Sequence, residues 1–294
     1  MLDRPLVTIG LSAYNAESTI GAVISSIISQ TYAHWELLLI DDGSLDSTIE
    51  VAAKFVDDRI TIVSDGQNKG LPIRLNQAVA MANGKYFCRM DHDDIAFLDR
   101  LEKQVTFLES NPNIDLLASS ILIFRNDGSI SGVVEVQEYH DNICKHPWRG
   151  FYFPHPTWMG KLEWFRLHAY TPRADGAEDQ LLLYSTFRTS KFAGLNDVLL
   201  AYRENSRIFK TIFKRRKVFW RELSTDAIKN GHLVDFFMLA VVQPLKIIAD
   251  LLNIKLGVKS AQYKLARTNP SIENRWRLMQ EHLNLNKSYI SNQN

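Results

Sequence analysis

Three aspartates fall within four positions near the first third of the chain. They stand in the run Asp91-His92-Asp93-Asp94, directly after the mainly apolar stretch from Lys85 to Met90. Like charges this close together repel one another unless a cation offsets them. Carboxylate oxygens suit Mg²⁺ and Mn²⁺, and Mg²⁺ usually binds through one or two carboxylates together with substrate phosphates. The run therefore predicts a metal–phosphate site, with a turn and helix cap before Phe97 as the alternative.

Two further acidic pairs could take part in chemistry. Asp41-Asp42 precedes Gly43-Ser44, where a carboxylate could accept hydrogen bonds from a nucleobase or ribose, although Asp-Gly is also a common turn pair. Glu178-Asp179 opens a predicted helix, and acids at that place also favour the positive end of the helix dipole. A carboxylate there could instead act as the general base that takes a proton from an acceptor hydroxyl. The sequence leaves both alternatives open.

Basic residues and one histidine are weaker candidates for binding phosphate. Asn68-Lys69-Gly70 precedes a predicted helix, with Arg74 one turn further on, and exposed basic residues at a helix start are the alternative. The chain has neither a GxxxxGK[ST] nor a GxGxxG motif, so it lacks the phosphate cradle of P-loop and dinucleotide-binding folds. His155, between two prolines, could contact metal or phosphate, although a lone histidine is more often structural.

Alternating strands and helices must position these side chains. In the first hundred residues we predict strands at 7–11, 35–40, 60–63 and 85–90, and helices from about 18 to 28 and at 47–56, 71–82 and 97–109. This alternation predicts an α/β fold, a parallel sheet with helices on both faces. Ligands bind beyond the carboxyl ends of the strands in such sheets. Because residues 12–15, 41–42 and 91–94 all follow strands, we expect them to converge at one edge.

The pattern weakens after residue 115. We predict a strand at 116–124, a hairpin turn at 126–129, a helix at 178–187 and a last short strand at 198–202. The aromatic-rich stretch 142–176 gives no clear assignment.

The charge is divided unevenly along the chain. Residues 1–204 carry 18 Lys/Arg and 27 Asp/Glu, a net charge of −9, whereas residues 205–294 carry 16 and 6, a net charge of +10. A basic segment beside an acidic domain suggests an anionic partner such as a membrane surface. The two cysteines, Cys88 and Cys144, form no CxxC pattern, which argues against a zinc site or a disulfide framework. The N-terminus does not resemble a signal peptide, so we expect a cytoplasmic location.

The basic segment begins with a predicted amphipathic helix. Arg207 to Arg221 contains seven basic residues and no acid, and its helical apolar face comprises Phe209, Ile212, Phe213 and Phe219 or Trp220. Such a helix is typical of membrane-surface binders, and a packed helix with a solvated basic face is the alternative. In the apolar stretch Leu233 to Ile254 the longest uninterrupted run is Phe236 to Val242, far short of the ~20 residues that a span requires. We therefore predict an interfacial or packed helix there.

Taken together, these segments resemble family 2 glycosyltransferases of the GT-A fold. The similar stretches lie within about residues 5–202: VTIGLSAYNAESTIGAVISSIISQTY, WELLLIDDGSLDST, NKGLPIRLNQAVAMANGKYFCRMDHDD and AEDQLLL. The resemblance implies a Rossmann-like GT-A catalytic domain over 1–204, with a mostly parallel central sheet, a donor-binding half at about 1–110 and an acceptor half at about 111–204. Residues 205–294 would form a basic helical extension that associates with the membrane.

The resemblance also implies an inverting transfer from a nucleoside diphosphate sugar, with a UDP-sugar favoured as the donor. Residues proposed for the nucleotide sugar are Ser12, Tyr14, Asp42, Lys69, Arg74 and Asp91, with Asp42 facing the base and Asp91 near the ribose or the sugar. Asp93 would ligate the Mn²⁺ or Mg²⁺ that bridges the diphosphate, with His155 as a further candidate ligand. Asp179 matches the catalytic base, and Glu178 would lie beside it on the acceptor side. At Leu71-Pro72-Ile73 the chain departs from the small residues common before the family's arginine, which puts the role of Arg74 in doubt.

The number of sugars added and the acceptor are predicted on different grounds. The QxxRW motif of processive synthases is missing, because Ile272 stands where the glutamine before Arg275-Trp276 should be, so we expect single-sugar addition. The family resemblance and the basic extension together imply a glycan or glycolipid acceptor, lipid-linked or lipopolysaccharide, at the inner face of the plasma membrane in surface-polysaccharide assembly. No nucleic-acid partner is expected. The alternatives are a sugar-phosphate nucleotidyltransferase, which would need a glycine-rich basic loop near the N-terminus, and a non-catalytic homologue, which the intact Asp93 and Asp179 disfavour.

Overall fold

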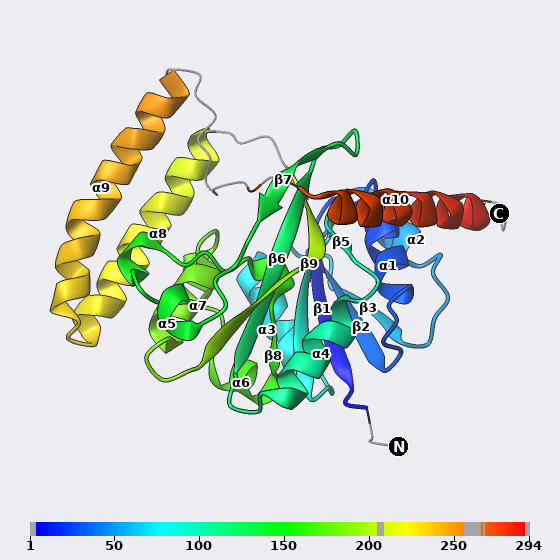
Figure 1. The fold of residues 1–294 in the computed structure, drawn as a ribbon, viewed down its shortest axis with the longest axis horizontal. Coiled ribbons are helices and arrows are strands. Elements are labelled where there is room, and N and C mark those ends of the chain that lie inside the picture. The colour runs from blue at the N-terminus through cyan, green and yellow to red at the C-terminus, as the bar shows by residue number, and fades with distance from the viewer. Residues whose placement is uncertain (1–3, 205–208, 256–265, 267, 292–294) are drawn as a thin grey trace.

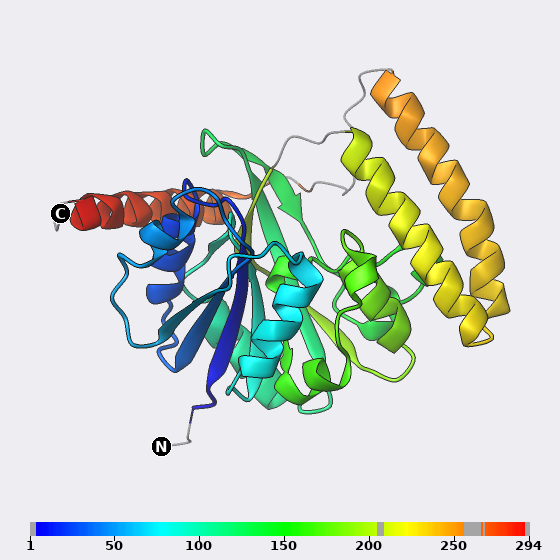
Figure 2. The ribbon, with the colours of Figure 1, turned by 180° about the vertical axis from the view of Figure 1, so that it is seen from behind.

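A nine-stranded mixed sheet runs through the protein, with helices covering both of its faces (Figures 1 and 2). The computed structural model describes residues 4–204, 209–255, 266 and 268–291. The strand order is β3-β2-β1-β4-β8-β6-β9-β5, and β7 pairs with β6 outside this path. The predicted α/β class, with a mostly parallel sheet in its first half and helices after it, is confirmed.

The first half of the sheet follows the predicted alternation closely. Its four strands are parallel to one another: β1 (Val7–Ala13), β2 (Trp35–Asp41), β3 (Ile60–Ser64) and β4 (Tyr86–Asp91). The connecting helices are α1 (Ile20–Ile28), α2 (Thr48–Ala52) and α3 (Leu71–Met81). In this register Ser12 lies beside Asp91, and Ala13 lies beside Asp41. The carboxyl ends of β1, β2 and β4 therefore form the common edge that the sequence predicts.

The second half contains strands that the sequence pattern did not show. It comprises β5 (Ile95–Ala96), α4 (Arg100–Ser110), β6 (Leu116–Phe124), β7 (Ile130–Val134), α5 (His140–Ile143), β8 (Met159–Lys161), α6 (Leu162–Leu167), α7 (Glu178–Thr186) and β9 (Phe192–Arg203). Single 3₁₀ turns are η1 (Pro147–Arg149), η2 (His155–Thr157) and η3 (Pro172–Ala174). β8 runs antiparallel between β4 and β6. Strands of two or three residues, such as β5 and β8, are too short to produce a periodic pattern.

Two predicted boundaries in this half were wrong. The helix predicted from residue 97 begins at Arg100, because the Phe97 N–H still donates to the Leu199 carbonyl of β9 at 3.0 Å. β9 begins at Phe192, six residues before the predicted strand, and its pairing with β6 shifts register near the polar pair Asn196-Asp197. Polar residues at that irregularity hide the first part of the strand from a pattern search.

The three C-terminal helices lie at opposite ends of the molecule (Figures 1 and 2). α8 (Phe209–Lys229) and α9 (Leu233–Lys255) pack together beside α7, whereas α10 (Pro270–Ser291) lies across the other flank beside α1. Arg207 and the side chains of Phe209 and Ile212 lie outside the described part of the chain. Of the described helices, none combines the length and the hydropathy needed to cross a bilayer.

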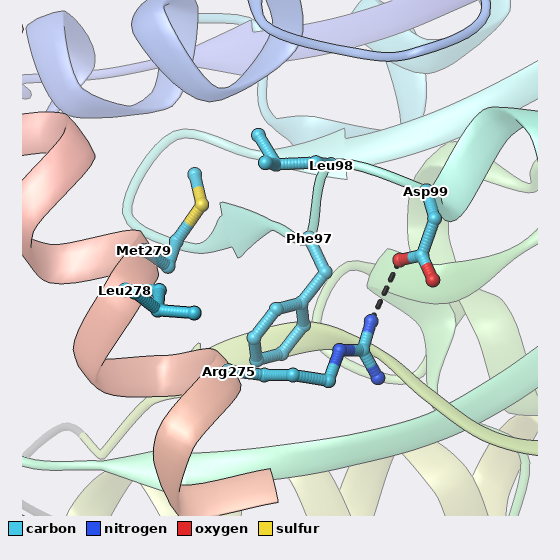
Figure 3. A pocket seen from close by; sticks show the side chains of 6 residues that line it. All are labelled: Phe97, Leu98, Asp99, Arg275, Leu278 and Met279. Atoms are coloured by element: carbon cyan, nitrogen blue, oxygen red, sulfur yellow. Dashed lines mark hydrogen bonds and ion pairs between the residues drawn. The ribbon is translucent and has the colours of Figure 1, made fainter. Parts of the chain in front are cut away.

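α10 is fastened to the segment that follows the aspartate run. Arg275 pairs with Asp99 at 2.6 Å and lies 4.7 Å from the centre of the Phe97 ring, at the rim of a small pocket (Figure 3). Trp276 is buried against Phe124 and donates its indole N–H to the Gly128 carbonyl at 2.8 Å. In this chain, therefore, the Arg-Trp pair without its glutamine holds α10 onto the catalytic fold.

Candidate active site

The aspartate run at the end of β4 forms a compact acidic group. One carboxylate oxygen each from Asp91, Asp93 and Asp94 lies within 4.8 Å of the others. Asp94 is fully buried; one of its oxygens accepts the Arg203 N–H at 3.0 Å, and the other has no hydrogen-bond partner among the described residues. Burial, followed by the charges of Asp91 and Asp93, raises the pKa of Asp94 well above its ordinary value. Three hard oxygen donors, one of them unpartnered, fit Mg²⁺ or Mn²⁺.

The alternative explanation of this run, as a helix cap, is wrong. α4 begins at Arg100, and the residue at its N-terminal boundary is Asp99. Residues 91–94 instead end β4 and lead into the short strand β5. The acids are therefore held by strands on both sides and not by a helix start.

Arg203, the last residue of β9, fixes the aspartate loop from across the sheet. Besides the backbone bond to Asp94, its guanidinium donates to the Asp93 carbonyl at 2.9 Å and lies 4.7 Å from the centre of the Phe124 ring. These contacts join two segments that are about 110 positions apart in the chain. The position of the acids thus depends on the last residue of β9, whereas the strand predicted from the sequence ended one residue earlier, at Tyr202.

Arg89 is a site residue that the sequence analysis missed. It belongs to β4, its side chain is 3% exposed, and its Nη2 lies 2.5 Å from Asp91 Oδ1. Its Nε and Nη1 have no hydrogen-bond partner among the described residues. A buried guanidinium with unsatisfied N–H groups is costly, so these donors point to a bound acceptor of hydrogen bonds. The sequence does contain a feature that could have indicated this residue, since Arg89 is the one charged residue within the strand sequence YFCRM.

Glu178 lies in a buried group with His155 and Tyr170. His155 Nε2 is 2.9 Å from the Tyr170 hydroxyl oxygen, and its Nδ1 is 3.8 Å from Glu178 Oε1. Burial, together with the charge of Arg89, lowers the pKa of His155 well below its ordinary value, so the ring is neutral. His155 does not belong to the possible metal-binding group of Asp91, Asp93 and Asp94. A role of His155 in binding metal or phosphate stays a prediction.

Glu178, the first residue of α7, has a strongly shifted pKa. Burial, followed by the charge of Asp179, raises the pKa of Glu178 to about 7. Glu178 also accepts the Gly176 N–H at 2.7 Å, and half-buried Asp179 accepts the side-chain N–H of Gln180 at 3.0 Å. The positive charge of Arg89 offsets part of the rise in the pKa of Glu178 and also interacts with Asp91 and Asp94. Arg89 therefore lies close to both the aspartate group and Glu178.

This burial gives a pH-dependent stability. A carboxyl whose pKa is higher in the folded protein than the ordinary 4.5 stabilises the fold at low pH, and that contribution is lost as the pH rises through about 7. Relative to Glu178→Gln, we therefore expect the free energy of unfolding of the wild type to fall by about 3 kcal/mol between pH 5 and about pH 8. Urea denaturation at several pH values measures this difference. Exposed Glu163→Gln is the control, and parallel pH curves for wild type and Glu178→Gln would contradict the assignment.

Asp42, Lys69 and Arg74 meet at the end of β2. Buried Asp42 accepts the backbone N–H groups of Lys69 and Gly70 at 2.7 and 3.0 Å, and the Arg74 Nε–H at 2.8 Å. Arg74 is 1% exposed and also pairs with Asp65, as does the Lys69 ammonium, each at 2.6 Å. These two hydrogen-bonding cations hold the pKa of Asp65 well below its ordinary value. In the described contacts, Asp42 and Arg74 therefore shape the loop between β3 and α3.

Asp41 and the loop after β1 form the neighbouring wall. Asp41 accepts the N–H groups of Gly43 and Ser44 and the Ser64 hydroxyl, so this acid does form the turn that Asp-Gly suggested. Asn15 ties the two loops together through the Ser44 hydroxyl at 3.0 Å and the Leu45 N–H at 2.9 Å. Between them, Ser12 is half-buried and Tyr14 is 41% exposed.

Comparison with known proteins identifies the family of the chain. Residues 8–168 match the model described as glycosyl transferase family 2. The chain belongs to this family. As a family 2 glycosyltransferase it is 35% identical over 217 residues to an uncharacterized glycosyltransferase of Haemophilus influenzae, covering 69% of this chain and 67% of the relative. Over 137 residues it is 37% identical to the UDP-Glc:alpha-D-GlcNAc-diphosphoundecaprenol beta-1,3-glucosyltransferase WfgD of Escherichia coli, covering 47% and 54%.

Solved structures show the same fold for this family 2 glycosyltransferase. S. aureus TarS 1-349 in complex with UDP-GlcNAc superimposes with a TM-score of 0.63 at 16% identity, over 93% of this chain and 79% of that one. Mannosyltransferase PcManGT from Pyrobaculum calidifontis, in complex with GDP-Man and Mn²⁺, also gives 0.63, at 18% identity over 98% and 87%. The predicted GT-A fold is thereby confirmed.

Proposed function

We propose that this glycosyltransferase moves a single sugar from a UDP-sugar, with inversion, to a lipid-linked or surface-polysaccharide acceptor. The observation that carries the proposal is that buried Arg89 lies between two acidic groups, since it pairs with Asp91 and its charge acts on Glu178. The first is the aspartate group with its unpartnered oxygen, and the second is the pair Glu178-Asp179, with the Arg89 charge acting on both.

On the donor side, the residues present fit a divalent cation. Asp93, with Asp91 and Asp94, would hold Mn²⁺ or Mg²⁺, which supplies positive charge that stabilises a leaving diphosphate. The free N–H donors of Arg89 are well placed to bind oxygens of the donor next to that group. Ser12, Tyr14 and Asp42 would border the nucleotide, with Lys69 and Arg74 setting the shape of the loop around Asp42.

On the acceptor side, Asp179 would take the proton of the attacking hydroxyl. Since the pKa of Glu178 is raised to about 7, Glu178 is largely protonated below that pH, and we assign the role of base to the less buried Asp179. The hydroxyl oxygen then attacks the anomeric carbon as its proton passes to the Asp179 carboxylate. Attack opposite the departing diphosphate inverts the configuration at that carbon.

The proposed acceptor class rests on the relatives. WfgD is named for transfer to a GlcNAc-diphosphoundecaprenol, and so is WfaP of Escherichia coli, 35% identical over 105 residues. We propose an acceptor of this lipid-diphosphate kind, with the enzyme bound peripherally at the inner face of the plasma membrane. Membership of the glycosyltransferase family disfavours the nucleotidyltransferase alternative. To distinguish an active enzyme from a non-catalytic homologue, donor binding must be measured together with the turnover of sugar transfer.

Donor binding provides the test. Isothermal titration of the full chain with UDP-, GDP- and dTDP-sugars should give tight binding of a UDP-sugar with Mn²⁺ and at least roughly tenfold weaker binding in EDTA, because the diphosphate then meets uncompensated carboxylates. In Asp93→Asn the dependence on metal should fall, whereas it should persist in Asp127→Asn, a change of the same kind in the exposed hairpin turn. Absence of metal-dependent binding with all three donors would overturn the donor assignment.

A further inference from the structure

α9 presents an apolar stripe to solvent. Six of its side chains are each 52–73% exposed: Val234, Phe237, Val241, Leu245, Ile248 and Leu252. They recur every three or four positions, the spacing that places side chains on one face of a helix. The stripe therefore extends along most of α9, which is the outermost helix of the molecule at this end (Figure 1).

Three polar side chains of α9 are turned toward the protein. Buried Asp235 accepts the Tyr184 hydroxyl at 3.0 Å, buried Gln243 donates to the Trp148 carbonyl at 2.7 Å, and Lys246 donates to the Arg149 carbonyl at 2.6 Å. With fully buried Leu239 they form the inner face of α9, whereas an ordinary surface helix turns its polar side chains to water. These contacts fix the rotation of α9 about its own axis. The helix cannot turn to bury the stripe without breaking them.

The helix that packs along α9 carries positive charge. The exposed residues of α8 include Lys214, Arg215, Lys217, Arg221 and Lys229. Residues 209–255, which contain α8 and α9, have nine Lys/Arg and four Asp/Glu, a net charge of +5. An apolar stripe beside a basic face complements a surface that offers both acyl chains and anionic headgroups.

We propose that α9 lies flat in the interface of an anionic lipid bilayer, with its stripe in the acyl boundary and the basic residues of α8 among the headgroups. A second copy of the chain fits the stripe less well, because a two-fold contact through α9 would bring two helix pairs of net charge +5 together. The inference rests on the proposed function and extends it by naming α9 as the surface that meets the membrane. On α8, Phe219 and Trp220 pack on the protein core, whereas Phe213 is 44% exposed.

The docked helix pair is joined to the acceptor side of the active site. Arg173 of η3 pairs with Glu222 of α8 at 2.6 Å, and Lys214 lies 3.5 Å from Asp175. The Arg215 side chain lies over Gly176, two residues before Glu178. Docking through α9 would therefore hold the loop that precedes Glu178-Asp179 near the lipid surface, where a lipid-linked hydroxyl is located.

Vesicle binding tests this surface directly. The full chain should sediment with vesicles of phosphatidylcholine and phosphatidylglycerol, and less with phosphatidylcholine alone. The double variant Phe237→Glu/Val241→Glu should bind at least roughly tenfold more weakly, because two charges would enter the acyl boundary. The matched control is Val56→Glu/Leu167→Glu, which makes the same changes at exposed apolar positions away from α9. Phe237→Leu/Val241→Leu should keep full binding.

Two results would overturn the inference. One is unchanged vesicle binding by Phe237→Glu/Val241→Glu. The other is a wild-type dimer, measured by light scattering, that this variant converts to a monomer while vesicle binding stays intact, since the stripe would then be covered by a second copy. Donor calorimetry on the same variant separates this inference from the proposed function. Loss of vesicle binding with unchanged UDP-sugar binding supports the inference whether or not the chain transfers a sugar.

Discussion

Asp179→Asn should lower the turnover of sugar transfer by roughly 10²–10⁴-fold while leaving donor binding nearly unchanged. The carboxamide keeps the size of the side chain and can still accept the Gln180 hydrogen bond, but it cannot take a proton. The proposed donor site is built from the ends of β1, β2 and β4, whereas Asp179 is at the start of α7. Initial rates with a lipid-diphosphate acceptor, and calorimetry with the donor, measure the two effects separately.

Two further variants make this result specific. Asp141→Asn, an exposed acid in α5, should retain wild-type turnover. Glu178→Gln mimics the protonated form of Glu178, so it should keep much of the activity if Asp179 is the base. Full turnover in Asp179→Asn, together with its loss in Glu178→Gln, would transfer the role of base to Glu178.

Arg89→Met should lower kcat/KM by roughly 10²–10³-fold, because it removes a buried positive charge from a site in which negative charge develops. The unbranched methionine fills much of the space of the arginine stem, so the apolar packing of β4 is largely kept. The loss should be greater for the UDP-sugar than for free UDP if the unpartnered Nε and Nη1 bind the sugar end of the donor. Steady-state kinetics and competitive inhibition by UDP measure this difference.

The control for Arg89 lies on the same part of the chain. Lys85→Met removes a positive charge just before β4, from a side chain that is 56% exposed and pairs with Glu109. We expect wild-type kinetics from it, since an exposed ion pair contributes little. If Arg89→Met retained wild-type kcat/KM, the unpartnered nitrogens would have no part in binding the donor.

Local periodicity was sufficient to predict the first half of the fold. The apolar runs of β1, β2 and β4 mark buried parallel strands, and their ends place residues 12–15, 41–42 and 91–94 at a common edge. Strand, helix and chain direction follow from neighbouring residues, which is why this half could be read from the sequence. The sequence also predicted that Asp91 to Asp94 follow the end of a strand. Excluding a helix cap as the explanation of this run required the observed start of α4 at Arg100.

The rest depended on contacts between distant segments. No local pattern shows that Arg203 holds the aspartate loop, that Arg74 pairs with Asp42, or that His155 lies against Tyr170. The same is true of β8, whose three residues form a strand only because they pair with β4 and β6. Such contacts are set by the packing of elements far apart in sequence.

By itself the sequence determined the α/β fold, the acidic edge of the sheet and the family to which the chain is similar. The tertiary structure decided which charges are paired, which donors of Arg89 stay unpartnered and which way α9 faces. The apolar residues of α9 are visible in the sequence, but a hydrophobic pattern does not distinguish a buried face from an exposed one. The buried polar contacts of Asp235 and Gln243 help to fix that rotation, because burying those groups is favourable only where partners from other elements meet them.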